Sequence, residues 1–246
     1  MIILPKRGLA YPGTAPRFSS SHPLAQAAVL GHGLACVANG TNLINLLSGA
    51  PGTRVGSPTS SVISPLGPTL NLSASGMEID FSGNYNAATE PIVTFAAIFQ
   101  INSLPGATAV IVSNNNDGTG GGGAALALNS SNQLALVPWG ATSRAATNIG
   151  ALSANIPYFA VASGNSGATV FVLLRLDNGI VLTDAQLGYA SNATLNTDVY
   201  SVGGSNNARP LLGKFAAGMW APAFHPLPKL VSFTKDPWSL WYYRGL

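Results

Sequence analysis

The 246-residue sequence has few charged residues: only 8% are Asp, Glu, Lys or Arg, against about 25% in an ordinary soluble domain. Its apolar content of 47% is ordinary, so uncharged groups must supply the polar surface, chiefly 20 Asn, 24 Ser and 16 Thr. Intrinsic disorder is excluded as the main state, because disordered chains combine low hydrophobicity with high charge. A net charge of +3 gives no reason to expect a nucleic-acid partner.

Cysteine is nearly absent as well. Cys36 stands alone, which excludes an intrachain disulfide and any zinc cluster built on cysteines. No apolar run reaches the roughly 18 residues that a membrane helix requires. The best stretch, 24–38, is interrupted by Gln26 and His32. We therefore expect no membrane insertion.

The few charges are unevenly placed. Residues 1–77 carry four bases and no acid, residues 78–206 carry seven acids and two bases, and residues 207–246 carry five bases and one acid. Basic ends around an acidic centre could pair within one chain. They could equally be docking surfaces for a partner.

Residues 1–23 predict an extended N-terminal arm, because four prolines and the serine run 19–21 interrupt regular structure. From about residue 29 the pattern is all-β, with short apolar runs separated by Gly, Asn, Ser and Pro clusters. Asn178-Gly179 predicts a two-residue hairpin turn, because it supplies the positive φ that such a turn requires. The expected strands are 29–37, 69–72, 77–81, 92–101, 109–113, 125–128, 134–139, 158–162, 169–176, 180–183, 199–202 and 215–221.

Strands at this spacing predict an antiparallel two-sheet jelly-roll sandwich. We expect three parts: the arm (1–23), the sandwich (24–235) and an aromatic C-terminal tail (236–246). The stretch 227–240 permits one short helix.

The order of these segments resembles the laminin-G-like, concanavalin-A-like jelly-roll family over residues 22–241. Both ends are similar to bacteriophage and prophage members, and the resemblance implies a protein of the virion, on tail, fibre or capsid surface, made in the host cytoplasm. The segments that carry the resemblance are EPIVTFAAIFQINSLPG (90–106), ALALNSSNQLALVPWG (125–140), ALSANIPYFAVASG (151–164), TVFVLLRLDNGIVL (169–182), GKFAAGMWAPAFHPLP (213–228), MIILPKRGL (1–9) with HPLAQAAVLGHGL (22–34), and DPWSLWYY (236–243).

The first functional hypothesis is a virion structural protein that acts by assembly, as a homo-oligomer among other virion proteins. The aromatic tail either folds back on the sandwich or forms a subunit contact, because aromatic residues are enriched in both settings. The candidate assembly contacts are Lys6, Arg7, Arg17, Trp238, Trp241, Tyr242 and Tyr243.

The second hypothesis is a module that binds host-surface glycan, with or without a place on a particle. The loop 114–123 lacks the Gly-Lys-Ser/Thr ending and the helix of a phosphate loop, whereas Asn side chains and bare Gly backbone suit sugar hydroxyls. The candidate glycan contacts are Asn114, Asn115, Asn116, Asp117, Trp139 and Tyr189.

A glycoside hydrolase is the third and least favoured hypothesis. Glu78 and Asp80 share one face of an expected strand, as in some concanavalin-A-like glycosidases. The third carboxylate of that pattern is missing, since Phe81, Ser82 and Gly83 follow. We therefore expect no enzyme and no catalytic residue.

Calcium is the usual metal of this fold, and it requires several oxygen ligands. Asp117 with its neighbouring Asn residues, or Asp184 and Asp198, could contribute such ligands. No Asp-x-Asp cluster is present, so we expect neither a metal nor another cofactor.

Overall fold

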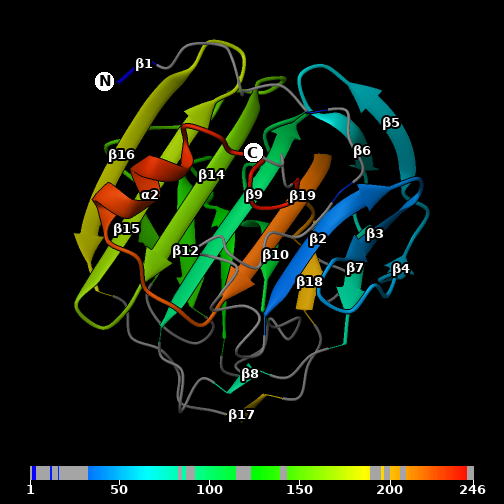
Figure 1. Ribbon diagram of the computed structural model, residues 1–246, viewed down its shortest axis with the longest axis horizontal. Coiled ribbons are helices and arrows are strands. Elements are labelled where there is room, and N and C mark those ends of the chain that lie inside the picture. Colours follow the sequence, from blue (N-terminus) through cyan, green and yellow to red (C-terminus); the bar gives the residue numbers. More distant parts are fainter. Residues whose placement is uncertain are drawn as a thin grey trace.

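The computed structural model describes residues 2–3, 12, 16, 33–82, 85–86, 92–114, 123–138, 143–188, 195–196, 200–205 and 209–242. These residues form two main antiparallel β-sheets that pack as a sandwich (Figure 1). The predicted all-β jelly-roll fold is therefore confirmed. Most of the predicted N-terminal arm lies outside the described residues.

The larger sheet has ten strands. They are β1 (Ile2–Ile3), β2 (Leu34–Asn39), β3 (Asn42–Asn45), β5 (Thr59–Ile63), β6 (Gly67–Leu72), β9 (Val93–Ile101), β14 (Pro157–Gly164), β15 (Ala168–Arg175), β16 (Ile180–Leu187) and β19 (Gly213–Ala221). Their order is β1–β16–β15–β14–β9–β19–β2–β3, and β6 and β5 branch from β19. The branch arises because β19 pairs with β6 over its first residues and with β2 over its later ones.

The smaller sheet has seven strands, in the order β13–β12–β11–β10–β18–β7–β4. They are β4 (Thr53–Val55), β7 (Glu78–Phe81), β10 (Ala109–Ser113), β11 (Ala124–Leu128), β12 (Leu134–Pro138), β13 (Arg144–Ala145) and β18 (Tyr200–Val202). Two short strands, β8 (Tyr85–Asn86) and β17 (Leu195–Asn196), pair with each other beyond one end of this sheet (Figure 1).

One short helix, α2 (Leu227–Phe233), lies over the larger sheet on β15 (Figure 1). It confirms the helix expected near the C-terminus. No helix in the described part of the chain has both the length and the apolar character to span a membrane.

The main core lies between the two sheets. Alternate residues of each strand point into it, so Leu126 and Leu136 of the smaller sheet belong to the same buried cluster as Phe95 and Phe99 of the larger sheet. Cys36 is buried in this cluster, as expected for a small apolar side chain. The smaller sheet is thereby fixed against one face of the larger sheet.

A second core covers the opposite face of the larger sheet. Ala96 and Ile98 of β9 and Val161 of β14 belong to this cluster, together with Trp238 and Trp241 of the tail. The indole Nε1 of Trp241 donates a hydrogen bond to Gly218 O at 3.1 Å. Because both faces of the larger sheet are covered, β9 and β14 are almost continuously apolar rather than alternating.

The structure corrects several strand limits. Within the expected strand 29–37, the described strand β2 begins at Leu34. The strand β16 was expected to end at residue 183, and it extends to Leu187. The strands β3, β4, β5 and β13 were not predicted, because they are short or polar and lack an apolar run.

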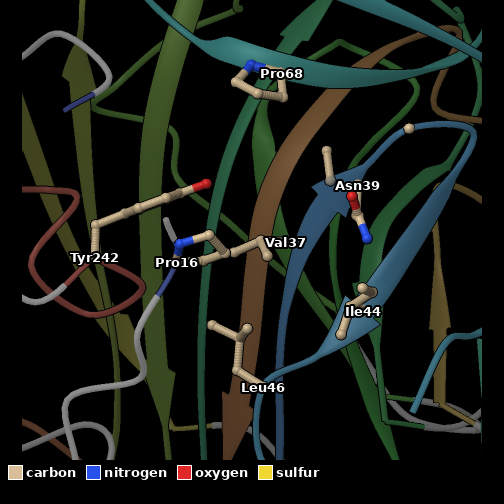
Figure 2. Close-up of a pocket in the computed structure, with 9 residues that line it drawn as sticks. Pro16, Val37, Asn39, Ile44, Leu46, Pro68 and Tyr242 are labelled. Atoms are coloured by element: carbon tan, nitrogen blue, oxygen red, sulfur yellow. The ribbon is translucent and has the colours of Figure 1, made fainter. Parts of the chain in front are cut away.

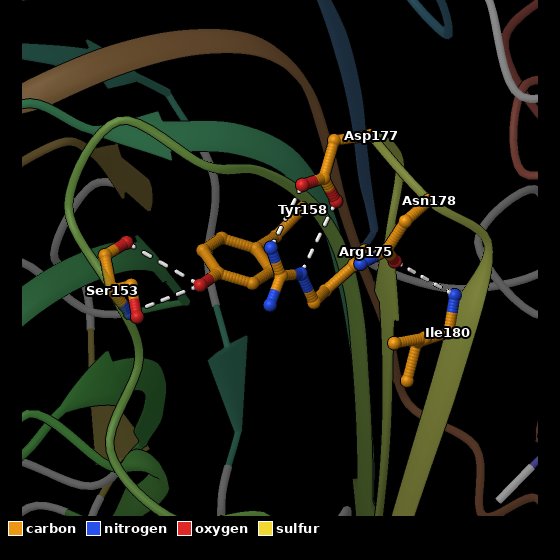
Figure 3. Close-up of polar contacts among 6 residues, drawn as sticks. All are labelled: Ser153, Tyr158, Arg175, Asp177, Asn178 and Ile180. Atoms are coloured by element: carbon orange, nitrogen blue, oxygen red, sulfur yellow. Dashed lines mark hydrogen bonds and ion pairs between the residues drawn. The ribbon is translucent and has the colours of Figure 1, made fainter.

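The predicted two-residue turn at Asn178-Gly179 is wrong. The loop between β15 and β16 has four residues, 176–179, and only Gly179 among them has a positive φ, of 77°. Asn178 instead accepts a hydrogen bond from Ile180 N on its Oδ1 at 3.0 Å, while Arg175 pairs with Asp177 at 2.8 Å (Figure 3). The Asn178 side chain thus forms a local turn with the backbone of Ile180, and Gly179 alone of the two residues supplies a positive φ.

A tyrosine holds the segment that leads into β14. The Tyr158 hydroxyl accepts a hydrogen bond from Ser153 N at 3.0 Å and donates one to Ser153 O at 3.3 Å (Figure 3). Burial raises the pKa of Tyr158, so the phenol stays neutral and remains able to donate. Its ring packs 5.9 Å from the Phe99 ring, centroid to centroid, which ties this segment to the main core.

If the tail is part of the folding unit, Trp241→Ala should lower the free energy of unfolding by about 3–5 kcal/mol, through loss of a buried indole. Urea unfolding of the full chain measures this effect. The control is Leu104→Ala, at an exposed position, where a change of about 0.5 kcal/mol or less is expected. Equal, small effects at the two sites would show that the tail adds nothing to the fold.

Candidate functional site

Three of the segments that carry the predicted glycan contacts leave the sandwich at one end of the smaller sheet. Ala124 pairs with Pro138, and Asn114 N donates to Ala124 O at 3.2 Å, so Asn114 and Pro138 lie on either side of the first residue of β11. Arg144 of β13 donates from Nε and Nη2 to Gly188 O, at 3.0 and 2.8 Å. We call this region, defined by Asn114, Pro138 and Gly188, the loop end.

The loop end adjoins most of the predicted glycan contacts in sequence. Residues 115–117 follow Asn114, Trp139 follows Pro138 and Tyr189 follows Gly188. Asn115, Asn116, Asp117, Trp139 and Tyr189 themselves lie outside the described residues. In the structure, Asn114 and Pro138 lie on either side of β11, and Gly188 is bonded to Arg144 of β13, the edge strand beyond β12.

Asn114, the one described member of the set, has a buried side chain. Its Oδ1 accepts a hydrogen bond from Ala124 N at 2.7 Å, which closes the base of the loop. Its Nδ2 has no hydrogen-bond partner among the described residues.

A polar row crosses the outer face of the smaller sheet next to the loop end. The strand register places Thr53, Asp80, Ser201 and Ser113 side by side. Ser201 Oγ donates to Gly204 O at 3.0 Å, and Ser113 Oγ donates to Ala124 O at 3.2 Å. Both hydroxyls thus donate to backbone carbonyl groups, and both serine side chains are fully buried.

The two carboxylates of the sequence pattern do share this outer face, as predicted, since Ile79 between them belongs to the main core. The Glu78 side chain is buried and Asp80 is half-buried. Burial raises the pKa of Asp80 to about 7, and the negative charge of Glu78 adds to this effect. Asp80 is therefore a carboxyl group that exchanges its proton near neutral pH.

The described residues do not supply a metal site around this pair. They contain no group of three or more His, Cys, Asp or Glu side chains that could hold a metal ion. The arrangement consists of one buried and one half-buried carboxyl group beside two hydroxyl oxygens.

Asp184, one of the candidate calcium ligands, has a structural role. Its Oδ1 accepts from Asn148 Nδ2 at 2.8 Å and Ala185 N at 2.7 Å, and its Oδ2 accepts from Asn148 N and Gln186 Nε2, both at 2.9 Å. Four donors occupy the carboxylate, so in this arrangement it has no lone pair directed at a cation. Asp117 and Asp198 lie outside the described residues.

The described tail aromatics are inside the molecule. Trp238, Trp241 and Tyr242 are each 3% exposed or less, and the Trp238 and Tyr242 rings meet edge to face at 5.5 Å. Of the two alternatives for the tail, folding back on the sandwich or contacting another subunit, the described residues adopt the first. The other assembly candidates, Lys6, Arg7, Arg17 and Tyr243, lie outside the described residues, and a contact with another chain stays a prediction.

A pocket of about 320 Å³ lies on the outer face of the larger sheet, beside β2 and β3. Val37, Ile44, Leu46, Pro68 and Tyr242 give it an apolar lining, and Pro16 lies between Tyr242 and Val37 (Figure 2). The N-terminal and C-terminal segments therefore meet here. None of the predicted glycan contacts lines this pocket.

Sequence reasoning missed the row formed by Thr53, Ser113 and Ser201. These residues come from three separate strands, and only the register of the sheet brings them beside Asp80. No spacing rule within one segment could have found them.

The comparisons with known proteins show the fold. No protein-family model matches the chain, and no curated protein matches it in sequence. Domain 4 of the arabinanase AbnA from Geobacillus stearothermophilus superposes with a TM-score of 0.57 at 12% identity, over 82% of this chain and 98% of that domain. The Trypanosoma rangeli sialidase gives 0.53 at 14% identity, over 82% of this chain and 32% of the sialidase.

The binding domain of botulinum neurotoxin DC also gives a TM-score of 0.53, at 12% identity, over 82% of this chain and 50% of that binding-domain chain. The chain spans about a third of the length of the sialidase that it matches. At such identities the likeness establishes the class of the protein, an antiparallel β-sandwich of the kind that these proteins contain.

The shifted pKa of Asp80 gives a testable pH dependence. The pKa of Asp80 is higher in the folded state than in the unfolded state, so the Asp80 carboxyl group stabilises the fold most below pH 4. This contribution to the free energy of unfolding is lost as the pH rises through about 7. Asp80→Asn removes this titration, so its stability relative to wild type should increase from pH 4 to pH 8 in urea unfolding. Asp177→Asn, at an ion-paired surface position, is the control. Parallel wild-type and Asp80→Asn curves would refute the assignment.

Proposed function

We propose that this protein is a component of a bacteriophage virion, in the tail, a tail fibre or the capsid surface. In this role the termini join it to the particle and to further copies of the chain, and the sandwich presents a glycan-binding surface to the host cell. The proposal includes no enzymatic activity and no cofactor.

The observation that carries the glycan-binding part is the convergence at the loop end. The anchors of three segments rich in Asn, Gly and aromatic residues are distributed over the strands β10 to β13 there, and the polar row of Thr53, Asp80, Ser201 and Ser113 begins beside Asn114. Surface loops at the end of a rigid sandwich are a common location for binding residues.

The structural neighbours are consistent with this use of the fold. The arabinanase domain was solved in complex with arabinotriose, and the neurotoxin binding domain in complex with SialylT. For the present chain these complexes support the choice of glycans as the ligands to test first.

The particle role depends on the resemblance of both chain ends to phage members and on the basic ends of the sequence. A glycan-binding module without a place on a particle is the alternative, since the convergence at the loop end supports it equally. A hydrolase is less favoured, because Glu78 is buried and no third carboxylate follows Asp80 in the sequence.

Removal of residues 1–18 should leave a folded domain that no longer joins the particle. Among the described residues of this segment, Ile2 and Ile3 are the ones that pair with β16, and β16 keeps its ladder with β15. Circular dichroism and thermal unfolding test folding, and complementation of a phage that lacks the protein tests incorporation. Normal incorporation of the truncated chain would disprove the attachment role of the arm.

Glycan binding should depend on the loop end. On an array of host surface polysaccharides, Trp139→Ala and the triple variant Asn115→Ala/Asn116→Ala/Asp117→Ala should each weaken binding by about tenfold or more. The matched control is Ser130→Ala/Ser131→Ala, at exposed positions in the turn at the opposite end of the β11–β12 hairpin. Absence of binding to every host polysaccharide would contradict the glycan proposal and leave the assembly role.

A further inference from the structure

In the described part of the chain, β5 is an edge strand of the larger sheet. Among the described residues it pairs with β6 alone, from Thr59 opposite Asn71 to Ile63 opposite Gly67. Figure 1 shows it at the rim of the larger sheet, on the side opposite β16. Val62, near its end, is 79% exposed.

The position of Pro68 in the ladder shows which backbone groups of β5 point away from β6. Val62 is opposite Pro68, and a proline has no N–H, so this pair cannot exchange two hydrogen bonds. In an antiparallel ladder the two types of pair alternate. The N–H and C=O groups of Val62 and Ser60 therefore point away from β6.

Within Thr59–Ile63 the edge lacks three of the features with which proteins protect such strands. Natural edges carry charged side chains, prolines or bulges that oppose pairing with another strand. No charged residue occurs from residue 55 to residue 77, and β5 itself, TSSVI, contains no proline. Its ladder with β6 has continuous register and no bulge.

We propose that β5 pairs with β5 of a second copy of this chain, antiparallel and about a two-fold axis at Ser61. This register places Ser60 opposite Val62 of the second copy and Val62 opposite Ser60, so the free N–H and C=O groups of both residues meet in four hydrogen bonds. The larger sheets of the two copies then form one continuous sheet.

A second copy of the chain can pair with this edge without electrostatic repulsion. Pairing about a two-fold axis brings the same short segment of both chains together, so a charge on it would lie close to its own copy. The absence of charge over residues 55–77 removes that repulsion. The contact is small, and we expect a reversible dimer that strengthens where copies are concentrated.

This inference is independent of the proposed function, because it involves neither the loop end nor the particle. A failure of glycan binding would leave it intact, and a monomeric chain would leave the glycan proposal intact.

Sedimentation equilibrium of the full chain from about 1 μM to about 1 mM is the first test. Wild type should show a monomer–dimer equilibrium, and Val62→Lys should weaken it by about tenfold or more, because lysine protects an edge from pairing. The matched control is Leu187→Lys on β16, at a residue that is 77% exposed. A monomeric wild type, or equal weakening by the two variants, would overturn the proposal.

Disulfide trapping tests the register. Ser61 faces Ser61 of the second copy in a non-hydrogen-bonded pair, with Cα atoms about 4.5 Å apart, which suits a disulfide. Ser61→Cys should therefore form a covalent dimer under mild oxidation, while Cys36 stays buried. Thr59→Cys should not, because its two copies would be about 13 Å apart. Efficient cross-linking at residue 59, or none at residue 61, would contradict this register.

Discussion

The structure depends on one constraint: the larger sheet is apolar on both faces. Phe95 and Phe99 point to the smaller sheet, while Ala96 and Ile98 of the same strand point the opposite way, and all four are fully buried. A sheet of this kind requires a cover on each side. The smaller sheet supplies one, and α2 with the tail supplies the other.

This constraint assigns different roles to the chain ends. Trp238 and Trp241 are committed to the second core, so as placed here they stabilise the sandwich rather than present a surface. Pro16 contributes only to the rim of the pocket beside Tyr242. Among the described residues, those of the C-terminal tail are therefore the ones that the second core requires.

The parts of the fold that sequence predicts are those buried on both faces. β9, β14 and β15 are long runs of apolar residues, and their identification needs no knowledge of their neighbours. β4 and β5 have largely exposed residues, so their strand state comes from pairing rather than composition. The same limit applies to the site: Glu78 and Asp80 are readable within one strand, but Ser113 and Ser201 join them only through the register.

The low charge of the chain has two different consequences in the fold. In the interior it is required, since a sandwich with two cores leaves few strand positions where a charged group meets water. At the rim it is not required, and there its absence leaves β5 without the protection that a single lysine would supply. A subunit that must stay apart from its copies would be expected to carry such a charge, whereas one that functions among them has no need of it.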